Sequence, residues 1–162
     1  MAVSKPDADR AASGPDLEVV ARALNSGAIH LLRSLAAVDR LAGLTPARLS
    51  ALSVIVFGGP QSLGALAAAE GVAGPTMTRI VDGLVAAGLA ERRPDPEDGR
   101  AVMIAPTVAG ENLTHAAAGR RIAAIAAAIS GLPAADRRRI AASAGLLDRL
   151  AAEIRKQEPG RT

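Results

Sequence analysis

The spacing of apolar residues along the chain predicts a protein built mainly from helices. Between residues 16 and 43, Leu, Val and Ala recur every three or four positions, which is the period of one face of an α-helix. Asp16 is the expected N-cap of this helix, and Gly43 is its expected end. By the same criteria we predict five further helices, at residues 46–57, 63–70, 75–87, 107–129 and 134–156.

One segment departs from the helical period. Residues 89–93 and 101–105 predict two short strands. Residues 94–99 between them end in Asp-Gly, which favours a tight turn. The expected order is therefore four helices, one β-hairpin and two helices.

The two short helices before the hairpin have the features of a helix-turn-helix. Ala67 supplies a small residue where the helices cross, and Gly71 tolerates the positive φ that the turn requires. Met77, Ile80 and Leu84 form the expected inward face of the second helix. A hairpin in this place can contact the DNA backbone or minor groove while the helix enters the major groove. We therefore predict a mainly α fold: a winged helix-turn-helix with a two-stranded β-wing and long dimerisation helices.

Several motifs between residues 44 and 113 resemble the MarR family of bacterial transcriptional regulators, at the intervals typical of that family. They are Leu-Thr-Pro at 44–46, Thr-Met-Thr-Arg-Ile-Val-Asp at 76–82, Gly-Leu-Ala-Glu-Arg at 88–92, Asp-Pro-Glu-Asp-Gly-Arg at 95–100 and Thr-x-x-Gly at 107–110. Each motif alone is only weakly specific for the family, whereas all five motifs together, in this order and at these intervals, are fairly specific for it.

The resemblance implies a homodimer that binds a roughly palindromic operator in double-stranded DNA. On the second helix of the motif it implies DNA contacts by Thr76, Thr78 and Arg79. Threonine can contact phosphate or a thymine methyl group, and arginine can bind guanine bidentately. In the turn of the wing, Asp98 is expected to orient Arg100, which enters the minor groove.

The first strand of the wing carries two more candidate DNA contacts, Arg92 and Arg93. Because side chains alternate along a strand, we expect the two arginines to point in different directions. We expect at least one of them to contact DNA, and the alternative is that both are merely solvated. Residues 61–100 hold four basic and six acidic residues, so the affinity for DNA is expected to be modest and salt-dependent.

The motifs and the apolar pattern divide the chain into five expected segments. These are a flexible N-terminal tail (1–15), an N-terminal dimerisation helix (16–43), a DNA-binding lobe (44–106), C-terminal dimerisation helices (107–156) and a flexible C-terminal tail (157–162). The helices outside the lobe are too apolar for the surface of a monomer, which favours a homodimer that buries them.

The composition excludes several other classes of protein. The chain has no Cys, Trp or Tyr and a single Phe, so it contains neither disulfides nor Cys-ligated zinc. No nucleophile elbow or phosphate-binding loop is present, and two histidines are too few for a metal site. We therefore expect no enzyme activity, catalytic residue, metal or cofactor. The polar N-terminal segment and the absence of a long apolar run predict a cytoplasmic protein without a membrane partner.

A small-molecule effector is a further candidate partner. The resemblance places effectors in a cleft between the dimerisation helices and the DNA-binding lobe, and His30, Phe57 and His115 are the candidate pocket residues there. Since the chain has one aromatic residue, a small aliphatic or anionic compound, or no effector, suits the sequence as well as a ring compound.

Two functional hypotheses follow from the sequence. The first is a sequence-specific DNA-binding regulator, expected to act as a repressor that an effector releases from its operator. The alternative is a winged-helix dimer that has lost operator recognition and serves as a small-molecule or protein-interaction module.

Overall fold

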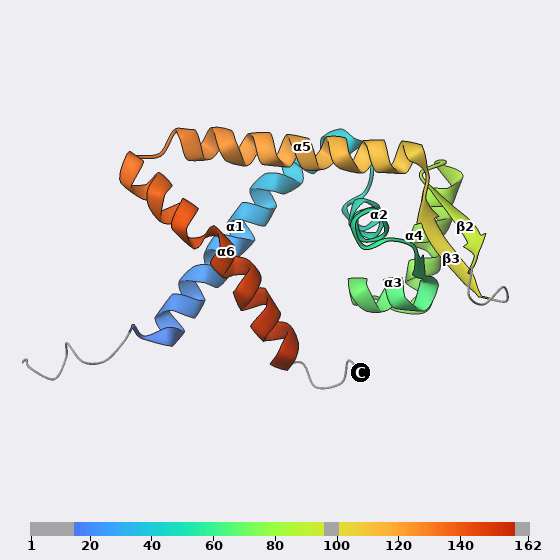
Figure 1. Cartoon of the computed structure of the whole chain (residues 1–162), viewed down its shortest axis with the longest axis horizontal. Coiled ribbons are helices and arrows are strands. Elements are labelled where there is room, and N and C mark those ends of the chain that lie inside the picture. The colour runs from blue at the N-terminus through green and yellow to red at the C-terminus, as the bar shows by residue number, and fades with distance from the viewer. Residues whose placement is uncertain (1–14, 96–100, 158–162) are drawn as a thin grey trace, which may run out of the picture. The chain divides into compact units, whose positions relative to one another are not determined.

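The protein is mainly helical, as the apolar pattern predicts, in a computed structural model that describes residues 15–95 and 101–157 (Figure 1). The elements are α1 (Leu17–Asp39), the short 3₁₀-helix η1 (Arg40–Ala42), α2 (Pro46–Gly58), β1 (Gln61–Ser62), α3 (Leu63–Glu70), α4 (Gly74–Ala86), β2 (Ala90–Pro94), β3 (Val102–Pro106), α5 (Val108–Ser130) and α6 (Ala134–Gln157). The predicted order of helices and hairpin is confirmed, and most boundaries agree within one or two residues.

Side chains just before three helices explain where these helices begin. The Asp16 carboxylate accepts a hydrogen bond from the Glu18 N–H at 3.0 Å. The Thr45 hydroxyl accepts one from the Arg48 N–H, and the Ser62 hydroxyl accepts one from the Ala65 N–H. Each bond satisfies an N–H group that has no partner inside its helix, and the predicted N-cap Asp16 is confirmed.

Two compact units divide the chain between Ala117 and Ala118, within α5. The first unit contains all of the sheet, helices α1 to α4 and the beginning of α5. The second contains the rest of α5 and the whole of α6.

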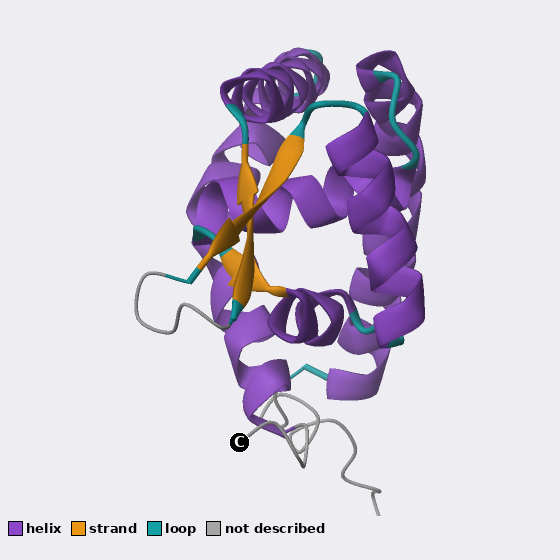
Figure 2. Cartoon of the chain, turned by 90° about the vertical axis from the view of Figure 1, so that its right-hand side faces the viewer, coloured by secondary structure: helices purple, strands orange, loops and turns teal. Residues whose placement is uncertain are grey.

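The wing belongs to a small antiparallel sheet with the strand order β1-β3-β2 (Figure 2). In β2, Arg92 lies opposite Ile104 and Arg93 lies opposite Met103. The predicted hairpin is confirmed, but the sheet has a third strand, because Gln61 and Ser62 pair with β3. A strand of two residues is too short to show an alternating pattern in the sequence. In addition, Ser62 is the N-cap of α3, so a serine at this position gives no sign of a strand.

The core of the first unit lies where α2, α3 and α4 pack together with β2 and β3. It consists of Ala51, Leu52, Ile55, Leu66, Ala67, Met77, Val81, Leu84, Leu89, Ala90 and Ile104. Gly71 adopts a φ of 64° in the turn between α3 and α4, as predicted. On α4, Met77 and Leu84 are buried as expected, whereas Val81 is fully buried and Ile80 only half-buried.

The beginning of α5 is attached to the end of α4 and the beginning of β2. The Thr107 hydroxyl donates to the Gly88 carbonyl at 2.7 Å and accepts from the Gly110 N–H at 3.1 Å. Gly110 is buried, and a Cβ atom at this position would lie 2.0 Å from the Leu89 carbonyl oxygen. The Thr-x-x-Gly motif therefore has a physical basis, because the threonine makes both hydrogen bonds and the glycine permits the close approach.

Helices α1 and α6 are apolar along one face, yet neither contains a buried residue in the single chain. The large apolar side chains left exposed on them include Leu17, Val19, Leu24, Leu31, Leu32, Leu146, Leu147, Leu150 and Ile154. Within the described ranges, no single helix is both long and apolar enough to cross a membrane; only the segments Leu17–Ala42 and Pro46–Gly58 pass that test together, across an 84° bend.

We predict that Gly110→Ala destabilises the protein by about 1–3 kcal/mol, because the added methyl group forces α5 away from the Leu89 carbonyl. Urea denaturation followed by circular dichroism measures this change. Gly119→Ala on the same helix is the control, because a Cβ there meets nothing within 4 Å and the substitution should stabilise the helix by about 0.5–1 kcal/mol. Equal stability of Gly110→Ala and the wild type would contradict the close approach of α5 to the Leu89 carbonyl.

Candidate nucleic-acid interface

Helix α4 presents an apolar face to the core and a polar face to solvent. Met77, Val81 and Leu84 are fully buried, whereas Thr76 and Arg79 are exposed. The helix begins at Gly74 after Ala73, which makes no side-chain capping bond. Pro75 has no N–H and the Thr76 N–H donates to the Ala73 carbonyl at 2.9 Å, so at the start of α4 the Gly74 N–H is the group left for solvent or an anion in the described structure.

The three predicted contact residues of α4 differ in what they offer a partner. Arg79 is exposed, and within the described residues its side chain has no hydrogen bond or ion pair. Thr78 is half-buried and its hydroxyl donates to the Gly74 carbonyl at 3.0 Å, so its proton is already engaged within the helix. Thr78 can still offer its methyl group and an oxygen lone pair, while Thr76 and Arg79 offer donors.

The two arginines of β2 point to opposite faces of the sheet, as the strand period predicts. Arg92 shares a face with the buried residue Ile104 and reaches α4, where its Nη2 atom lies 2.5 Å from Asp82 Oδ1. Arg93 lies on the other face and pairs with Glu91, with Arg93 Nε at 2.6 Å from Glu91 Oε1. Both predicted DNA contacts on β2 therefore have carboxylate partners in the free chain.

Sequence reasoning missed the role of Asp82, which it counted only as one of the acidic residues of the lobe. Asp82 lies three residues after Arg79 and four after Thr78, so all three share one side of the helix. That spacing is visible in the sequence, but the partner of Asp82 is not, because it depends on how β2 packs beside α4. The remaining predicted pair, Asp98 and Arg100, lies outside the described residues.

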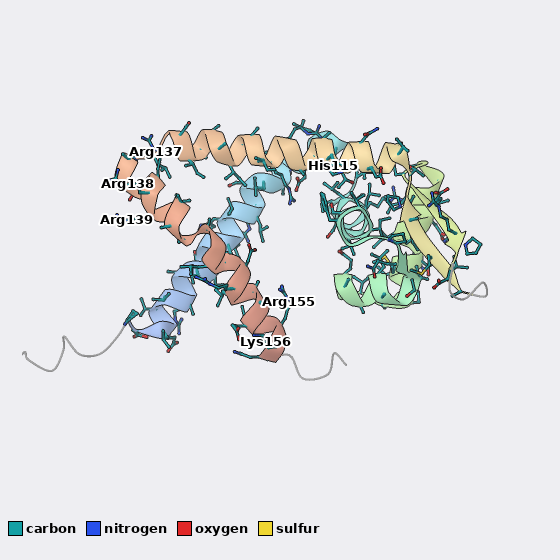
Figure 3. The ribbon with its side chains drawn as sticks, in the orientation of Figure 1. His115, Arg137, Arg138, Arg139, Arg155 and Lys156 are labelled. Carbon is teal, nitrogen blue, oxygen red and sulfur yellow. The ribbon has the colours of Figure 1, made fainter. Side chains whose placement is uncertain are left out.

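Of the three candidate pocket residues, the structure brings two together. Phe57 at the end of α2 and His115 on α5 have ring centroids 5.6 Å apart at an interplanar angle of 81°, an edge-to-face contact. Figure 3 labels His115 on α5. His30 is exposed on α1, and no ring contact joins it to the other two in the part of the chain that is described.

A cavity of about 260 Å³ lies in the first unit, on the Arg93 side of the sheet. Its lining is formed by Ile55, Val56, Gly59, Pro60, Arg93, Ala105, Pro106, Val108 and Glu111. The surface of the cavity is polar and apolar in about equal parts, with one cationic and one anionic side chain, and the lining includes none of the three predicted pocket residues. Over the described ranges, no cluster of three or more His, Asp or Glu residues could hold a metal ion.

The geometry now defines the class of protein. A helix-turn-helix whose second helix is polar on its outer side, followed by an antiparallel hairpin, is a winged helix-turn-helix. A family model described as the MarR family matches residues 42–101. The chain belongs to the MarR family of transcriptional regulators, a class whose members are not enzymes.

Relatives and solved structures agree with this assignment. An uncharacterized HTH-type transcriptional regulator of Mycobacterium bovis is 31% identical over 124 residues, which cover 76% of this chain and 87% of the relative. Another from Mycobacterium leprae is 34% identical over 94 residues, 58% of this chain and 66% of the relative. The crystal structure of a transcriptional regulator from Thermotoga maritima has a TM-score of 0.71 at 29% identity, covering 87% of this chain and 99% of that one. A MarR family protein from Bacillus stearothermophilus shares the fold, with a TM-score of 0.74 at 21% identity, over 85% of this chain and 94% of that one.

We predict that Phe57→Leu shifts the ring-proton resonances of His115 in NMR spectra, because the phenyl ring current acts on a ring 5.6 Å away. His30 is the internal control, since the chain has only two histidines and His30 makes no ring contact in the described structure. Equal and small changes for both histidines would show that the Phe57–His115 contact is absent in solution.

Proposed function

We propose that the protein is a homodimeric, sequence-specific DNA-binding repressor that recognises a palindromic operator. In this proposal α4 enters the major groove and contacts it with Thr76, Thr78 and Arg79, while the wing follows the adjacent backbone and minor groove. The contribution of the wing is assigned to Arg92, Arg93 and the Asp98–Arg100 pair. Since the proposed partner is DNA, we expect the protein to act in the cytoplasm.

The observation that carries the proposal is the two-sided character of α4. Its inner side is fixed by Met77, Val81 and Leu84, which are fully buried. Its outer side is therefore held rigidly and presents polar groups that match phosphates and base edges. An exposed arginine without a partner in the described structure, Arg79, is the strongest candidate for a base contact.

The exposed apolar faces of α1 and α6 support a homodimer. A monomer would leave most of these Leu, Ile and Val side chains in water, and exposed apolar helix faces of this kind are typical of interfaces. We propose that a two-fold interface formed by the segments at 16–43 and 107–156 covers them. Such symmetry places two copies of α4 on successive major grooves, about 34–36 Å apart.

We further propose that a small effector regulates DNA binding. The contact between Phe57 and His115 and the cavity beside Arg93 are the two candidate sites within the first unit. An effector acts here only if it binds the DNA-competent and DNA-incompetent spacings of the lobes with different affinities. The lining holds one basic residue, Arg93, and one acidic residue, Glu111, so a small compound with both an anionic and a cationic or hydrogen-bonding group suits the cavity.

The charge distribution favours one alternative function, a winged-helix dimer that serves as an interaction module. Residues 61–100 hold four basic and six acidic residues, whereas residues 118–157 hold eight basic and three acidic ones. Basic residues also occur at both ends of α6, as Figure 3 shows for Arg137, Arg138, Arg139, Arg155 and Lys156. The absence of sequence-dependent DNA binding would make this alternative the leading one.

We predict that Arg79→Ala weakens binding to the selected operator by about 1–3 kcal/mol and relaxes its sequence preference, because a base contact is lost. Fluorescence anisotropy with a labelled operator duplex measures the dissociation constant. Arg138→Ala removes the same charge from α6 and is the matched control, for which we expect little change. If Arg79→Ala and Arg138→Ala bind the operator equally well, α4 does not contact DNA through Arg79.

We predict that the wild-type protein has twice the mass of the single chain in light scattering, and that Leu147→Glu has the mass of one chain. A carboxylate in place of the exposed Leu147 side chain would be buried without a partner in the proposed dimer. Val102→Glu in β3 is the control, because Val102 is similarly exposed but lies outside the proposed interface. A monomeric wild type would contradict the dimer.

A further inference from the structure

Asp82 is a carboxylate on the side of α4 that carries the proposed DNA contacts. It lies on the solvent-facing side of α4, one turn beyond Thr78 and Arg79. In the proposed complex this side of the helix faces the groove and its flanking phosphates. An unpaired carboxylate there repels the phosphate backbone, and this repulsion acts on every DNA sequence alike.

In the free chain the partner of Asp82 is Arg92, which belongs to the wing. The two side chains approach to 2.5 Å, yet Arg92 is 41% exposed and Asp82 56% exposed. Because both groups remain accessible, a phosphate can compete with Asp82 for the guanidinium. The carboxylate therefore opposes DNA binding in two ways, through its own charge and by occupying an arginine that could bind phosphate.

The ion pair is not needed to hold the wing in place. Strand β2 pairs with β3 along its whole length, from Ala90 opposite Pro106 to Pro94 opposite Val102. An exposed ion pair adds little to stability compared with such a ladder. Removing the Asp82 charge should therefore leave β2 where it is and change mainly the electrostatics of the interface.

We propose that Asp82 limits the affinity of the lobe for DNA of any sequence by sequestering Arg92 and repelling phosphates. This inference rests on the proposed DNA-binding function. Because the penalty is the same on the operator and on other sequences, it lowers both affinities by a similar factor and leaves their ratio unchanged. Its effect is to lower the occupancy of non-cognate DNA, which is held by phosphate contacts alone.

The test compares Asp82→Asn with the wild type on a random-sequence duplex of roughly 25 base pairs, a little over two helical turns. The matched control is Glu18→Gln, which also removes one carboxylate and releases an arginine, Arg22. Glu18 lies on α1, outside the proposed DNA-binding lobe, so a general charge effect is shared by both variants and an effect local to the α4 interface is not. Asp82→Ser provides a second removal of the charge if the asparagine variant folds poorly.

We expect Asp82→Asn to bind the random duplex several-fold more tightly, with a salt slope steeper by about 1.8, because each of the two Arg92 side chains in the proposed dimer gains a phosphate. That added slope corresponds to about a 12-fold larger loss of affinity between 50 and 200 mM salt. Affinity for the operator should rise by a similar factor, because the penalty does not depend on sequence. Glu18→Gln should change neither the affinity for the random duplex nor the salt slope comparably.

Two other outcomes overturn the inference, and they are distinguishable. If the wild type binds random duplex at low salt but Asp82→Asn and Asp82→Ser bind it no more tightly, Asp82 does not limit non-specific binding, and the proposed function stands. If the wild type binds no duplex at all at low salt, the proposed function fails and the inference fails with it.

Discussion

The packing of α4 on the core is the constraint on which the proposed interface depends. Met77, Val81 and Leu84 lose all contact with water, and burial of three such side chains contributes on the order of several kcal/mol. Because these three side chains must face the core, the orientation of α4 about its own axis is fixed. In that orientation Thr76 and Arg79 face the solvent. The polar surface available to DNA is thus fixed by apolar residues that would never touch DNA.

The same packing determines how the charges of the lobe are arranged. Because β2 runs beside α4, Arg92 meets Asp82, whereas Arg93 turns to the other face and meets Glu91. Helix α4 carries one Arg and one Asp, and β2 carries two Arg and one Glu, so each acidic side chain of the two elements pairs with an arginine. Because the arginines of β2 are paired and residues 61–100 are acidic overall, we expect the free lobe to attract polyanions weakly.

The sequence predicted the elements better than the side-chain partners. The periodic apolar positions and caps such as Asp16 and Ser62 are local signals, so the helices and the hairpin could be predicted. The strand β1 could not, because its two residues carry no period and gain strand character only by pairing with β3. The Asp82–Arg92 pair likewise depends on tertiary packing, as does the edge-to-face contact of Phe57 with His115. The placement of Asp98 and Arg100 remains a prediction.

Selection of bound duplexes from a random-sequence pool by the whole protein tests the central claim most directly. The account predicts enrichment of a two-fold symmetric site whose half-sites are separated by about one helical turn, 10–10.5 base pairs. Such a site would follow from two copies of α4 related by symmetry. Enrichment of no sequence, even at low salt where electrostatic attraction is strongest, would contradict the account and leave an interaction module as the function of this fold.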